Sequence, residues 1–529
     1  MCGFLAYFGE SLDIETLEAE SQKIQYRGPD NTKSIKINEK MFMSFHRLSI
    51  IDVTENANQP LFHPDDPGIS LVCNGEIYNY KELIKKFDLK VSSGSDCEVI
   101  VHLYKKLGLK KMLSLLDGVF SFCLYDSHKD VLFVARDPYG VRPCFISISE
   151  SFTAIASELK ALSNIATNII PFQPGCWWSS DYPTVITSYC SLPLVYASDS
   201  NEKNICEKIR DLLSAAVNKR LMSDREVGCL LSGGLDSSLV ASLVAQSFDN
   251  PKNLKTFSIG MKGSPDLKYA RLVADHIKSD HHEVMVSEKE FLDSIEKVIY
   301  NIESYDTTTV RASVGNYLVS KYISENTDVK VVFNGDGADE VCMGYVYNIN
   351  APTEYEFYEE NKRLLSEIYL FDVLRSDRSI SSNGLEPRTP FLDREFVRYY
   401  MSLKPSLKMF GNGKPEKYLL RKSFSDENIL PDDVLWRNKC AFSDGVSDIN
   451  NSWHEIIKEL VDKKITDEEF ERERSRFSIC KPALKESYYY RKIYESHFGR
   501  NLNLIPHFWM PRWVNTLDPS ARELDGYRE

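Results

Sequence analysis

Short apolar runs separated by turn residues make up most of the chain up to about residue 190. Runs of this length between turn signals are typical of β-strands in a layered structure. The runs are "CGFLAYFG" (2–9), "MFMSFHRLSIID" (41–52), "ISLVCNGEIYN" (69–79), "VFSFCLYDS" (119–127), "VLFVARDPYGVRPCFISIS" (131–149) and "FTAIAS" (152–157). Helical periodicity is clearest in "DCEVIVHLYKKLG" (96–108). The pattern therefore predicts a β-rich first domain with few helices.

The pattern changes near residue 200, where strand-like runs begin to alternate with helical ones. The strand-like runs are "VGCLL" (227–231), "LKTFSIG" (254–260), "HEVMV" (282–286) and "VKVVF" (329–333), and the helical ones include "SSLVASLVAQS" (237–247) and "LKYARLVADHIK" (267–278). Alternation of this kind is typical of right-handed βαβ units, so we expect an α/β domain with a doubly wound parallel sheet. The aromatic-rich remainder of the chain is predicted to add extra helices.

A polar stretch, "YASDSNEKN" (196–204), lies between the two patterns. Its composition is typical of a linker. The predicted domains are therefore residues 2–195 and 205–529.

Composition and charge narrow the class of protein. The 529 residues are 43% hydrophobic and 27% charged, as in ordinary globular proteins. Lys and Arg number 64 against 77 Asp and Glu, and the resulting net charge of -13 disfavours nucleic acid and anionic membranes as partners. The sequence contains neither an apolar run long enough to span a membrane nor a secretory signal. The 12 cysteines are scattered singly, as suits a reducing compartment. We expect a cytoplasmic protein with no nucleic-acid or membrane partner.

A string rich in glycine and serine, "LLSGGLDSS" (230–238), joins a strand-like run to a helical one. Paired glycines at such a junction let backbone N–H groups and the helix N-terminus bind an anion, of which phosphate is the commonest. The string lacks the spacing and the lysine of a Walker loop, and it lacks the spacing of a dinucleotide fingerprint. Ligands of open parallel sheets bind at the carboxyl ends of the strands. We therefore expect a phosphate site at this loop.

The same string resembles the loop of enzymes that cleave ATP between its α and β phosphates to adenylate a substrate. A second string, "FNGDGADEVCMGY" (333–345), is similar to the second signature of the asparagine synthetase family. Four further segments resemble that family in the same order: "YDTTTVRAS" (305–313), "LEPRTPFLD" (385–393), "WRNKCAFSDGV" (436–446) and "WMPRWVNTLDPSAR" (509–522). The resemblance is closest to animal-type, glutamine-hydrolysing members. It implies glutamine, aspartate and ATP as substrates, Mg²⁺ as a cofactor, β-aspartyl-AMP as the intermediate, and a homodimer as one possible assembly.

Cys2 stands directly behind the initiator methionine. A thiol attacks as the thiolate and needs a nearby base, and removal of Met1 would free the α-amine of Cys2 for that task. Four segments match glutamine amidotransferases that use a terminal cysteine: "RGPD" (27–30), "HRLSIID" (46–52), "NGEIYNY" (74–80) and "GSDCE" (94–98). The resemblance implies a four-layer α-β-β-α N-terminal-nucleophile hydrolase domain, and we expect the mature chain to start at Cys2.

In the first domain the resemblance implies a nucleophile, an oxyanion hole and a clamp for glutamine. Cys2 would attack the side-chain amide while Asn74 and the Gly75 N–H hold the developing oxyanion. Arg47 would pair with the substrate α-carboxylate, and Asp96 with its α-ammonium. The implied glutamine-binding set is Arg47, Leu48, Ser49, Ile50, Ile51, Asn74, Gly75, Glu76 and Asp96.

In the second domain the resemblance implies sites for ATP and aspartate. The implied ATP-binding set is Leu231, Ser232, Gly233, Gly234, Asp236, Ser237, Ser238, Ile259, Asn334 and Gly335. Thr308, Thr309 and Asp339 would lie near aspartate and Mg²⁺, whose protein ligands the sequence leaves open. Asp336, Lys439 and Arg311 are implied to be catalytic, with structural ion pairs as the alternative for Lys439 and Arg311.

Two positions depart from the usual pattern of the family. Asp336 stands where glutamate is usual, and Asn334 stands where serine is usual. We interpret the pair as a local co-adjustment within a working enzyme, with drift in an inactive relative as the alternative. His281 and His282 have no third metal ligand nearby in sequence, so a structural role is predicted for both.

Three other functions fit parts of the sequence. A β-lactam-forming relative would lack Cys2 and the glutamine clamp. A tRNA-modifying relative fits poorly with the acidic charge and the missing nucleic-acid module. A catalytically silent nutrient-binding regulator would have lost Cys2 or the S-G-G-x-D-S string.

Overall fold

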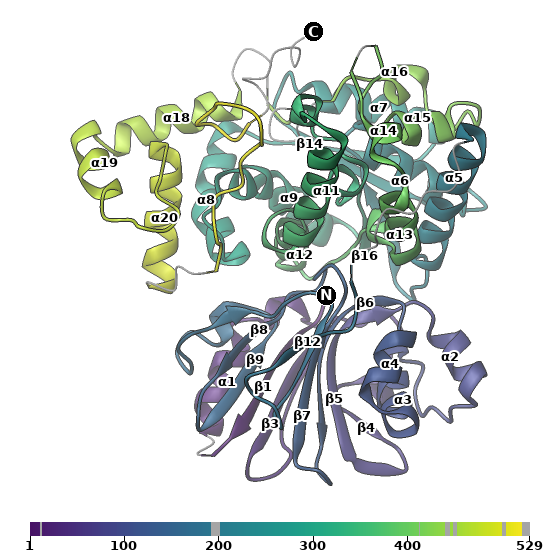
Figure 1. Ribbon diagram of the computed structural model, residues 1–529, viewed down its shortest axis with the longest axis vertical. Helices are drawn as coiled ribbons and strands as arrows, with labels where there is room; N and C mark the ends of the chain where they lie inside the picture. The colour runs from purple at the N-terminus through teal and green to yellow at the C-terminus, as the bar shows by residue number, and fades with distance from the viewer. Residues whose placement is uncertain are drawn as a thin grey trace. The chain divides into compact units, whose positions relative to one another are not determined.

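The computed structural model describes residues 1–10, 13–191, 201–411, 413–439, 445–447, 452–499 and 504–520. The chain forms two compact units (Figure 1). Unit 1 consists of Met1–Ser191 and two later segments, Met222–Glu226 and Ser381–Glu386, which lie in the range predicted for the second domain. Unit 2 consists of Leu192–Leu221, Val227–Ile380 and Pro387–Glu529.

The predicted linker lies partly outside the described residues, which omit 196–200. Its last residues are helical, because the Asn201 side chain caps α5 (Glu202–Lys219) by accepting from the Lys203 N–H.

Within the described residues, unit 1 contains two six-stranded sheets with the strand orders β10-β8-β9-β1-β3-β2 and β12-β11-β7-β6-β5-β4. The strands are β1 (Gly3–Gly9), β2 (Asn31–Lys36), β3 (Met41–Arg47), β4 (Leu61–His63), β5 (Asp66–Ile77), β6 (Gly118–Asp126), β7 (Val131–Arg136), β8 (Phe145–Ile148), β9 (Phe152–Ala156), β10 (Ile170–Pro171), β11 (Cys176–Ser179) and β12 (Ile186–Ser188). The helices of this unit are α1 (Ile14–Gln22), α2 (Tyr80–Phe87), α3 (Val99–Leu107) and α4 (Leu109–Leu115).

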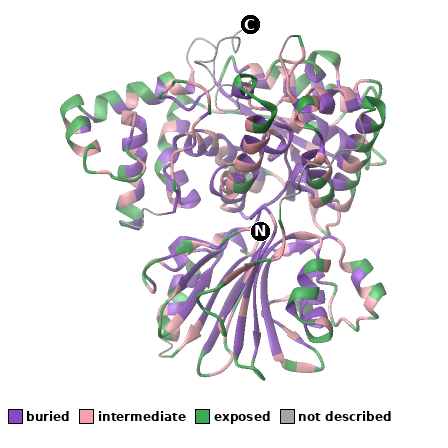
Figure 2. Cartoon of the chain, in the orientation of Figure 1, coloured by how far each residue is buried: buried purple, intermediate pink, exposed green. Residues whose placement is uncertain are grey.

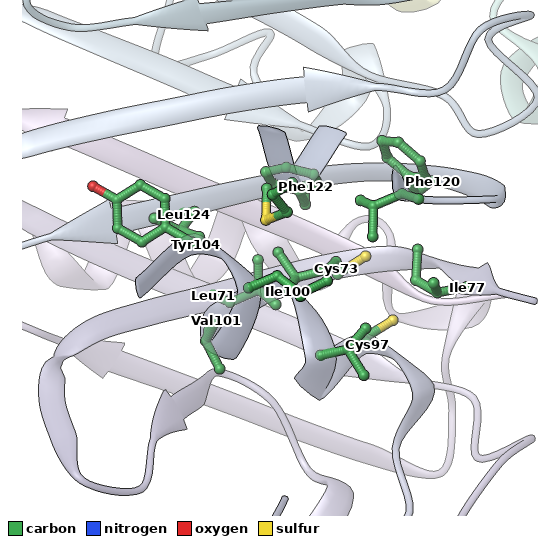
Figure 3. Packing of buried hydrophobic residues seen from close by; sticks show 14 of the residues in the cluster. Leu71, Cys73, Ile77, Cys97, Ile100, Val101, Tyr104, Phe120, Phe122 and Leu124 are labelled. Atoms are coloured by element: carbon green, nitrogen blue, oxygen red, sulfur yellow. The ribbon is translucent and has the colours of Figure 1, made fainter. Parts of the chain in front are cut away.

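Both faces of the second sheet of unit 1 are apolar, which produces the layers. One face shares a core with the first sheet, in which Val72 and Cys123 pack with Phe4 and Ile155. The opposite face packs against α3, as Figure 3 shows for side chains around Ile100. Successive strand residues point to opposite faces, so a continuous apolar run serves both layers. Because α1 contacts β1 and β3, the unit has the four-layer α-β-β-α arrangement that the resemblance implied.

The described part of unit 2 is built on a five-stranded sheet with the order β15-β14-β13-β16-β17. Its strands are β13 (Glu226–Leu230), β14 (Lys255–Gly260), β15 (Asp280–Met285), β16 (Val329–Phe333) and β17 (Glu386–Arg388). β14 pairs in parallel with both β13 and β15. The chain moves outward from β13 to β15 and returns to the other side of β13 with β16. This reversal creates a switch point between β13 and β16, as predicted for a doubly wound sheet.

Helices cover the sheet of unit 2, and Figure 2 shows the buried strands inside exposed outer helix faces. Besides α5 they are α6 (Leu235–Ala245), α7 (Pro265–Ile277), α8 (Glu288–Ile302), α9 (Thr307–Asn326), α10 (Ala338–Cys342), α11 (Glu354–Glu367), α12 (Asp372–Ser381), α13 (Arg394–Ser402), α14 (Pro405–Lys408), α15 (Tyr418–Phe424), α16 (Asp432–Leu435), α18 (Trp453–Lys464), α19 (Asp467–Arg474) and α20 (Lys485–Phe498). None of the helices in the described part of the chain combines the length and the apolar character needed to cross a membrane.

Candidate active sites

Cys2 lies in unit 1 directly before β1 and next to the loop that follows β3. Its thiol donates to the Leu48 carbonyl at 3.7 Å, and the Leu48 N–H donates to Sγ at 3.4 Å. Met1 is buried, and its ammonium group donates to the Leu385 carbonyl at 3.0 Å. Burial raises the pKa of the Cys2 thiol to about 11. With Met1 attached, this thiol is therefore protonated near neutral pH.

Asn74 and Gly75 lie side by side on β5, opposite Ser121 and Phe120 of β6. The Asn74 side chain is fully buried, yet neither its oxygen nor its nitrogen has a hydrogen-bond partner among the described residues. Buried amides in folded proteins are nearly always hydrogen-bonded, so this one points to a ligand. A Cβ at position 75 would lie 2.3 Å from the Val119 carbonyl oxygen, which restricts the position to glycine.

Arg47, at the end of β3, organises the loop that touches Cys2. Its Nη1 donates to the Thr54 carbonyl at 2.7 Å and to Asn58 Oδ1 at 2.8 Å. Its Nη2 donates to the Ile51 carbonyl at 3.3 Å. The loop enclosed by these bonds contains the predicted glutamine-binding residues Leu48, Ser49, Ile50 and Ile51. The Arg47 guanidinium thus shapes the loop as well as adding a positive charge to it.

Two buried carboxylates lie near the end of β5. Asp96 Oδ2 accepts from the Ile77 N–H at 2.6 Å. Burial is the main cause of the raised pKa of the Cys2 thiol, and the negative charge of nearby Glu76 adds to it. The loop after β3 is linked to Cys2 by the hydrogen bonds of Leu48, and the end of β5 is linked to it by the charge of Glu76. The residues predicted for the glutamine site therefore gather in one region of unit 1.

Unit 2 contains a cavity of about 280 Å³ at the switch point between β13 and β16. Most of the residues predicted for ATP, aspartate and catalysis line it: Leu231, Ser232, Gly234, Asp236, Ser237, Ile259, Thr308, Thr309, Arg311, Asn334, Gly335, Asp336, Asp339 and Lys439. Gly233 and Ser238 of the predicted ATP set are absent from the wall. Ser238 is fully buried, and Gly233 turns the loop.

The loop between β13 and α6 has the geometry of an anion site. Gly233 has φ +71°, and a Cβ there would lie 2.5 Å from the Ala270 nitrogen, so only glycine fits. Ser237 Oγ accepts from the Ser232 N–H at 3.2 Å and closes the turn. Helix α6 begins at Leu235, and its positive N-terminal end lies at the cavity.

A cluster of two lysines and two aspartates adjoins this loop. Lys417 Nζ lies 2.5 Å from a carboxylate oxygen of both Asp236 and Asp339. Lys439 Nζ lies 2.5 Å from Asp339 and 3.8 Å from Asp236. Although burial opposes ionisation, the two lysines hold the pKa of Asp339 well below its usual range. Sequence reasoning missed Lys417, which is separated from Asp236 by 181 positions and stands in no recognised string.

Asp336 follows β16 and also lines the cavity. Its Oδ1 lies 3.2 Å from Arg375 Nη2 on α12, and the same nitrogen donates to Asp372 at 2.7 Å. Burial raises the pKa of Asp336, and the charge of Arg375 opposes this rise. Arg375 is a second wall residue that the sequence did not reveal.

The first turn of α9 positions Thr308, Thr309 and Arg311. Asp306 caps the helix, because its Oδ2 accepts from the Thr309 N–H at 2.9 Å and from both threonine hydroxyls at 2.7 and 2.8 Å. Arg311 is buried, and its guanidinium donates to Glu486 at 2.6 and 2.8 Å and to Asp518 at 2.9 and 3.1 Å. Its charge is therefore balanced by two buried carboxylates.

Both histidines of the pair have side-chain partners nearby, and His282 Nδ1 lies 3.3 Å from the Tyr322 hydroxyl oxygen. The His281 ring lies within hydrogen-bond distance of Thr256 Oγ1 at 2.9 Å and of Ser258 Oγ at 3.0 Å. Among the described residues, no group of three or more His, Cys, Asp or Glu side chains is arranged to hold a metal ion.

Comparison with known proteins covers both units. The family described as "Asparagine synthase" matches residues 208–362 and 350–516, and the "Glutamine amidotransferase domain" family matches residues 1–171. The chain is 44% identical over 560 residues to a protein of Gallus gallus named "Asparagine synthetase [glutamine-hydrolyzing]". Proteins of the same name from Bos taurus and Homo sapiens are 43% and 42% identical over 560 residues. Each alignment covers 100% of this chain and 99% of the relative.

Proposed function

The chain belongs to the glutamine-hydrolysing asparagine synthetase family, and from this premise we propose how its residues divide the reaction. The enzyme converts L-aspartate, ATP and L-glutamine into L-asparagine, glutamate, AMP and pyrophosphate through β-aspartyl-AMP. We assign glutamine hydrolysis to residues 2–195 and asparagine formation to residues 205–529. The observation that carries the second assignment is the cavity that joins the S-G-G-x-D-S loop to the cluster of Lys417, Lys439, Asp236 and Asp339.

In the glutaminase half, Cys2 Sγ attacks the side-chain amide carbon of glutamine. The Asn74 amide nitrogen and the Gly75 N–H stabilise the oxyanion of the tetrahedral intermediate, and each such donor is worth about 3 kcal/mol in the transition state. Ammonia departs with a proton from the cysteine amine, and water hydrolyses the thioester to glutamate. The buried and unpartnered Asn74 amide supports this role, because a developing oxyanion supplies the acceptor it lacks.

The remaining residues of this half select glutamine by its charged end. Asp96, with Glu76 beside it, attracts the α-ammonium. Arg47 attracts the α-carboxylate and keeps the backbone of residues 48–51 in place through its bonds to Thr54 and Asn58. Recognition of both charges explains why glutamine, and not an uncharged amide, is the substrate.

In the synthetase half, the backbone of the loop at Ser232–Ser238 binds the ATP phosphates. Leu231 and Ile259 contact the base and ribose, and Asn334 and Gly335 flank the nucleotide. Lys417 and Lys439 neutralise the charge that develops on pyrophosphate as the aspartate β-carboxylate attacks the α phosphate. Thr308 and Thr309 contact the reacting carboxylate, while Arg311 fixes the wall beneath them.

Asp336 serves the second step. Ammonia attacks the acyl carbon of β-aspartyl-AMP, the bond to the phosphate oxygen breaks, and AMP leaves with its electron pair. The Asp336 carboxylate accepts the proton that the new amide nitrogen releases. Arg375 stays paired with this carboxylate and favours its charged form.

Mg²⁺ fits the acidic part of the cavity. Asp236 Oδ1 is buried and has no hydrogen-bond partner among the described residues. Mg²⁺ in nucleotide enzymes is typically held by one or two carboxylates together with substrate phosphates. Asp236 and Asp339 would hold the ion, which supplies charge neutralisation for the triphosphate.

The cellular setting is proposed on chemical grounds. All cysteines that the structure describes are free thiols, which suits a cytoplasmic enzyme. Its partners are the small substrates rather than nucleic acid, and a homodimer is the proposed assembly. Light scattering on the purified protein tests the homodimer.

One assay tests the proposed reaction. Purified protein is incubated with glutamine carrying ¹⁵N in its amide, aspartate, ATP and Mg²⁺, and the products are identified by mass spectrometry. The expected products are ¹⁵N-asparagine and AMP in equal amounts. Formation of ADP in place of AMP would contradict adenylation, and unlabelled asparagine would contradict the use of glutamine as the nitrogen source.

A further inference from the structure

Asp336 carries the shorter carboxylate at a position where the resemblance to the family implied a glutamate. An aspartate carboxylate lies about 1.5 Å closer to its own backbone than a glutamate carboxylate. A displacement of about 1 Å at a reacting centre can cost 100-fold in rate. A working enzyme with Asp336 therefore needs contacts that fix this carboxylate at the wall of the cavity.

The neighbouring Asn334 connects Asp336 to α12. Its Oδ1 accepts from the Asp336 N–H at 3.3 Å, and its Nδ2 donates to Ser376 Oγ at 2.7 Å. Both Asn334 and Ser376 are buried. The amide is used at both ends, so the orientation of its oxygen and nitrogen is fixed by its partners.

This arrangement leaves the Ser376 hydroxyl hydrogen available for another acceptor. Ser376 Oγ accepts from Asn334, so its own hydrogen has to point elsewhere. Ser376 directly follows Arg375, whose Nη2 lies 3.2 Å from Asp336 Oδ1. Burial raises the pKa of Asp336, and the charge of Arg375 and a hydrogen bond from Ser376 oppose this rise. Two successive residues of α12 thus hold the segment at Asp336: Arg375 through an ion pair with the carboxylate, and Ser376 through the Asn334 amide that accepts from the Asp336 N–H.

We propose that Ser376, oriented by Asn334, is a positioning residue for the Asp336 carboxylate in asparagine formation. The inference rests on the proposed role of Asp336 and extends it to two more residues. Ser376 lies outside the recognised strings, and Asn334 departs from the usual pattern of the family. Asn334 and Asp336 then form a matched change: the longer amide at 334 reaches α12, and the hydroxyl that it orients holds the shorter carboxylate at 336.

The test combines substitutions at positions 376 and 336. Ser376→Ala should lower kcat for ammonia-dependent asparagine formation about tenfold and change the KM for aspartate less than twofold, while glutaminase activity stays at the parent rate. In Asp336→Glu the longer carboxylate no longer depends on Ser376. Adding Ser376→Ala to that variant should therefore cost less than twofold.

Two further variants keep the test decisive. Ser379→Ala removes another buried serine hydroxyl from α12, one that donates to the Arg375 carbonyl, and should leave kcat within twofold of the parent. If Ser376→Ala does not fold, Asn334→Ser replaces it, because this change removes the donor to Ser376 and should reproduce the tenfold loss of kcat.

The outcomes separate this inference from the proposed function. If Asp336→Ala makes asparagine at the parent rate, Asp336 has no role in the mechanism and the inference falls with it. If Asp336→Ala abolishes synthesis but Ser376→Ala keeps the parent rate, only the inference is overturned. An equal tenfold loss from Ser376→Ala in the parent and in Asp336→Glu would show a general structural role and would also overturn it.

Discussion

At the scale of single residues, the chemistry of Cys2 depends on the residue before it. The thiol is bonded to Leu48, and burial raises its pKa to about 11, so it is a poor nucleophile while Met1 remains attached. Loss of Met1 removes a buried neighbour and creates an amine next to the thiol. The Cys2 thiol is thus unreactive while the Met1–Cys2 peptide bond is intact and becomes reactive once that bond is cleaved.

We therefore predict that active protein begins at Cys2. Intact-mass analysis should show the loss of Met1. In protein with an uncleaved N-terminal tag, glutaminase activity should be absent, and iodoacetamide should alkylate Cys2 about tenfold faster for each pH unit up to about pH 11, because thiolate increases with pH below the raised pKa. Active protein that retains Met1 would refute the proposed base.

Lys417 supports a second prediction at this scale. Lys417→Met removes the buried cation shared by Asp236 and Asp339, and asparagine formation should fall about 100-fold, as when one transition-state donor is removed. Glutamine hydrolysis should continue. Lys422→Met, on the helix α15 that Lys417 precedes, is the control and should behave like the parent in both assays. Equal asparagine rates for the two variants would exclude Lys417 from the phosphate site.

The residues that the sequence predicted share one property. Leu231, Asp236 and Asp339 stand in strings whose neighbours already define a turn or a strand end. Lys417, Arg375 and Ser376 acquire their roles only through folding, because α12 and α15 bring them to loops more than 30 positions away. Local patterns carry no information on such contacts.

At the scale of elements, the strand-to-helix loops of unit 2 follow directly from the sequence, whereas the later helices do not. The runs predicted as strands became β13 to β16. β14 and β16 are buried over most of their length, as is typical of central parallel strands, whereas β15 at the edge of the sheet is mostly polar and has Val284 as its buried residue. Helix α19 (Asp467–Arg474) is polar on almost every side, with Phe470 as its buried residue, so no periodic pattern predicts its bounds.

Arg311 ties α9 to α20 and to Asp518, which gives a prediction of stability. Arg311→Met leaves Glu486 and Asp518 buried without their cation and should lower the free energy of unfolding by about 3–5 kcal/mol. Arg271→Met breaks the half-exposed pair with Glu283 and should cost less than about 1 kcal/mol. Urea denaturation followed by tryptophan fluorescence compares the two variants. A small loss for Arg311→Met would indicate that its charge acts on substrate instead.

At the scale of the whole molecule, the two reactions depend on separate sets of residues. Cys2→Ala should abolish glutamine-dependent asparagine formation and leave ammonia-dependent formation within about twofold of the parent, because the residues that line the ATP cavity all lie beyond residue 229. Steady-state rates with each nitrogen donor measure this. If high ammonia fails to restore synthesis in a folded variant, the division into two sites is wrong.

Unit 1 is assembled from segments far apart in the sequence, and this affects when it can fold during translation. Ser381–Glu386 belongs to this unit, and Ser381 Oγ accepts at 2.8 Å from the same Arg27 that holds the Cys2 carbonyl. A ribosome has therefore to translate nearly three quarters of the message before the surroundings of the nucleophile are complete. Residues 1–191 released early would lack this support, so glutamine hydrolysis should mature only once most of the synthetase half has been synthesised. An unfinished chain that lacks this segment should therefore release little ammonia from glutamine.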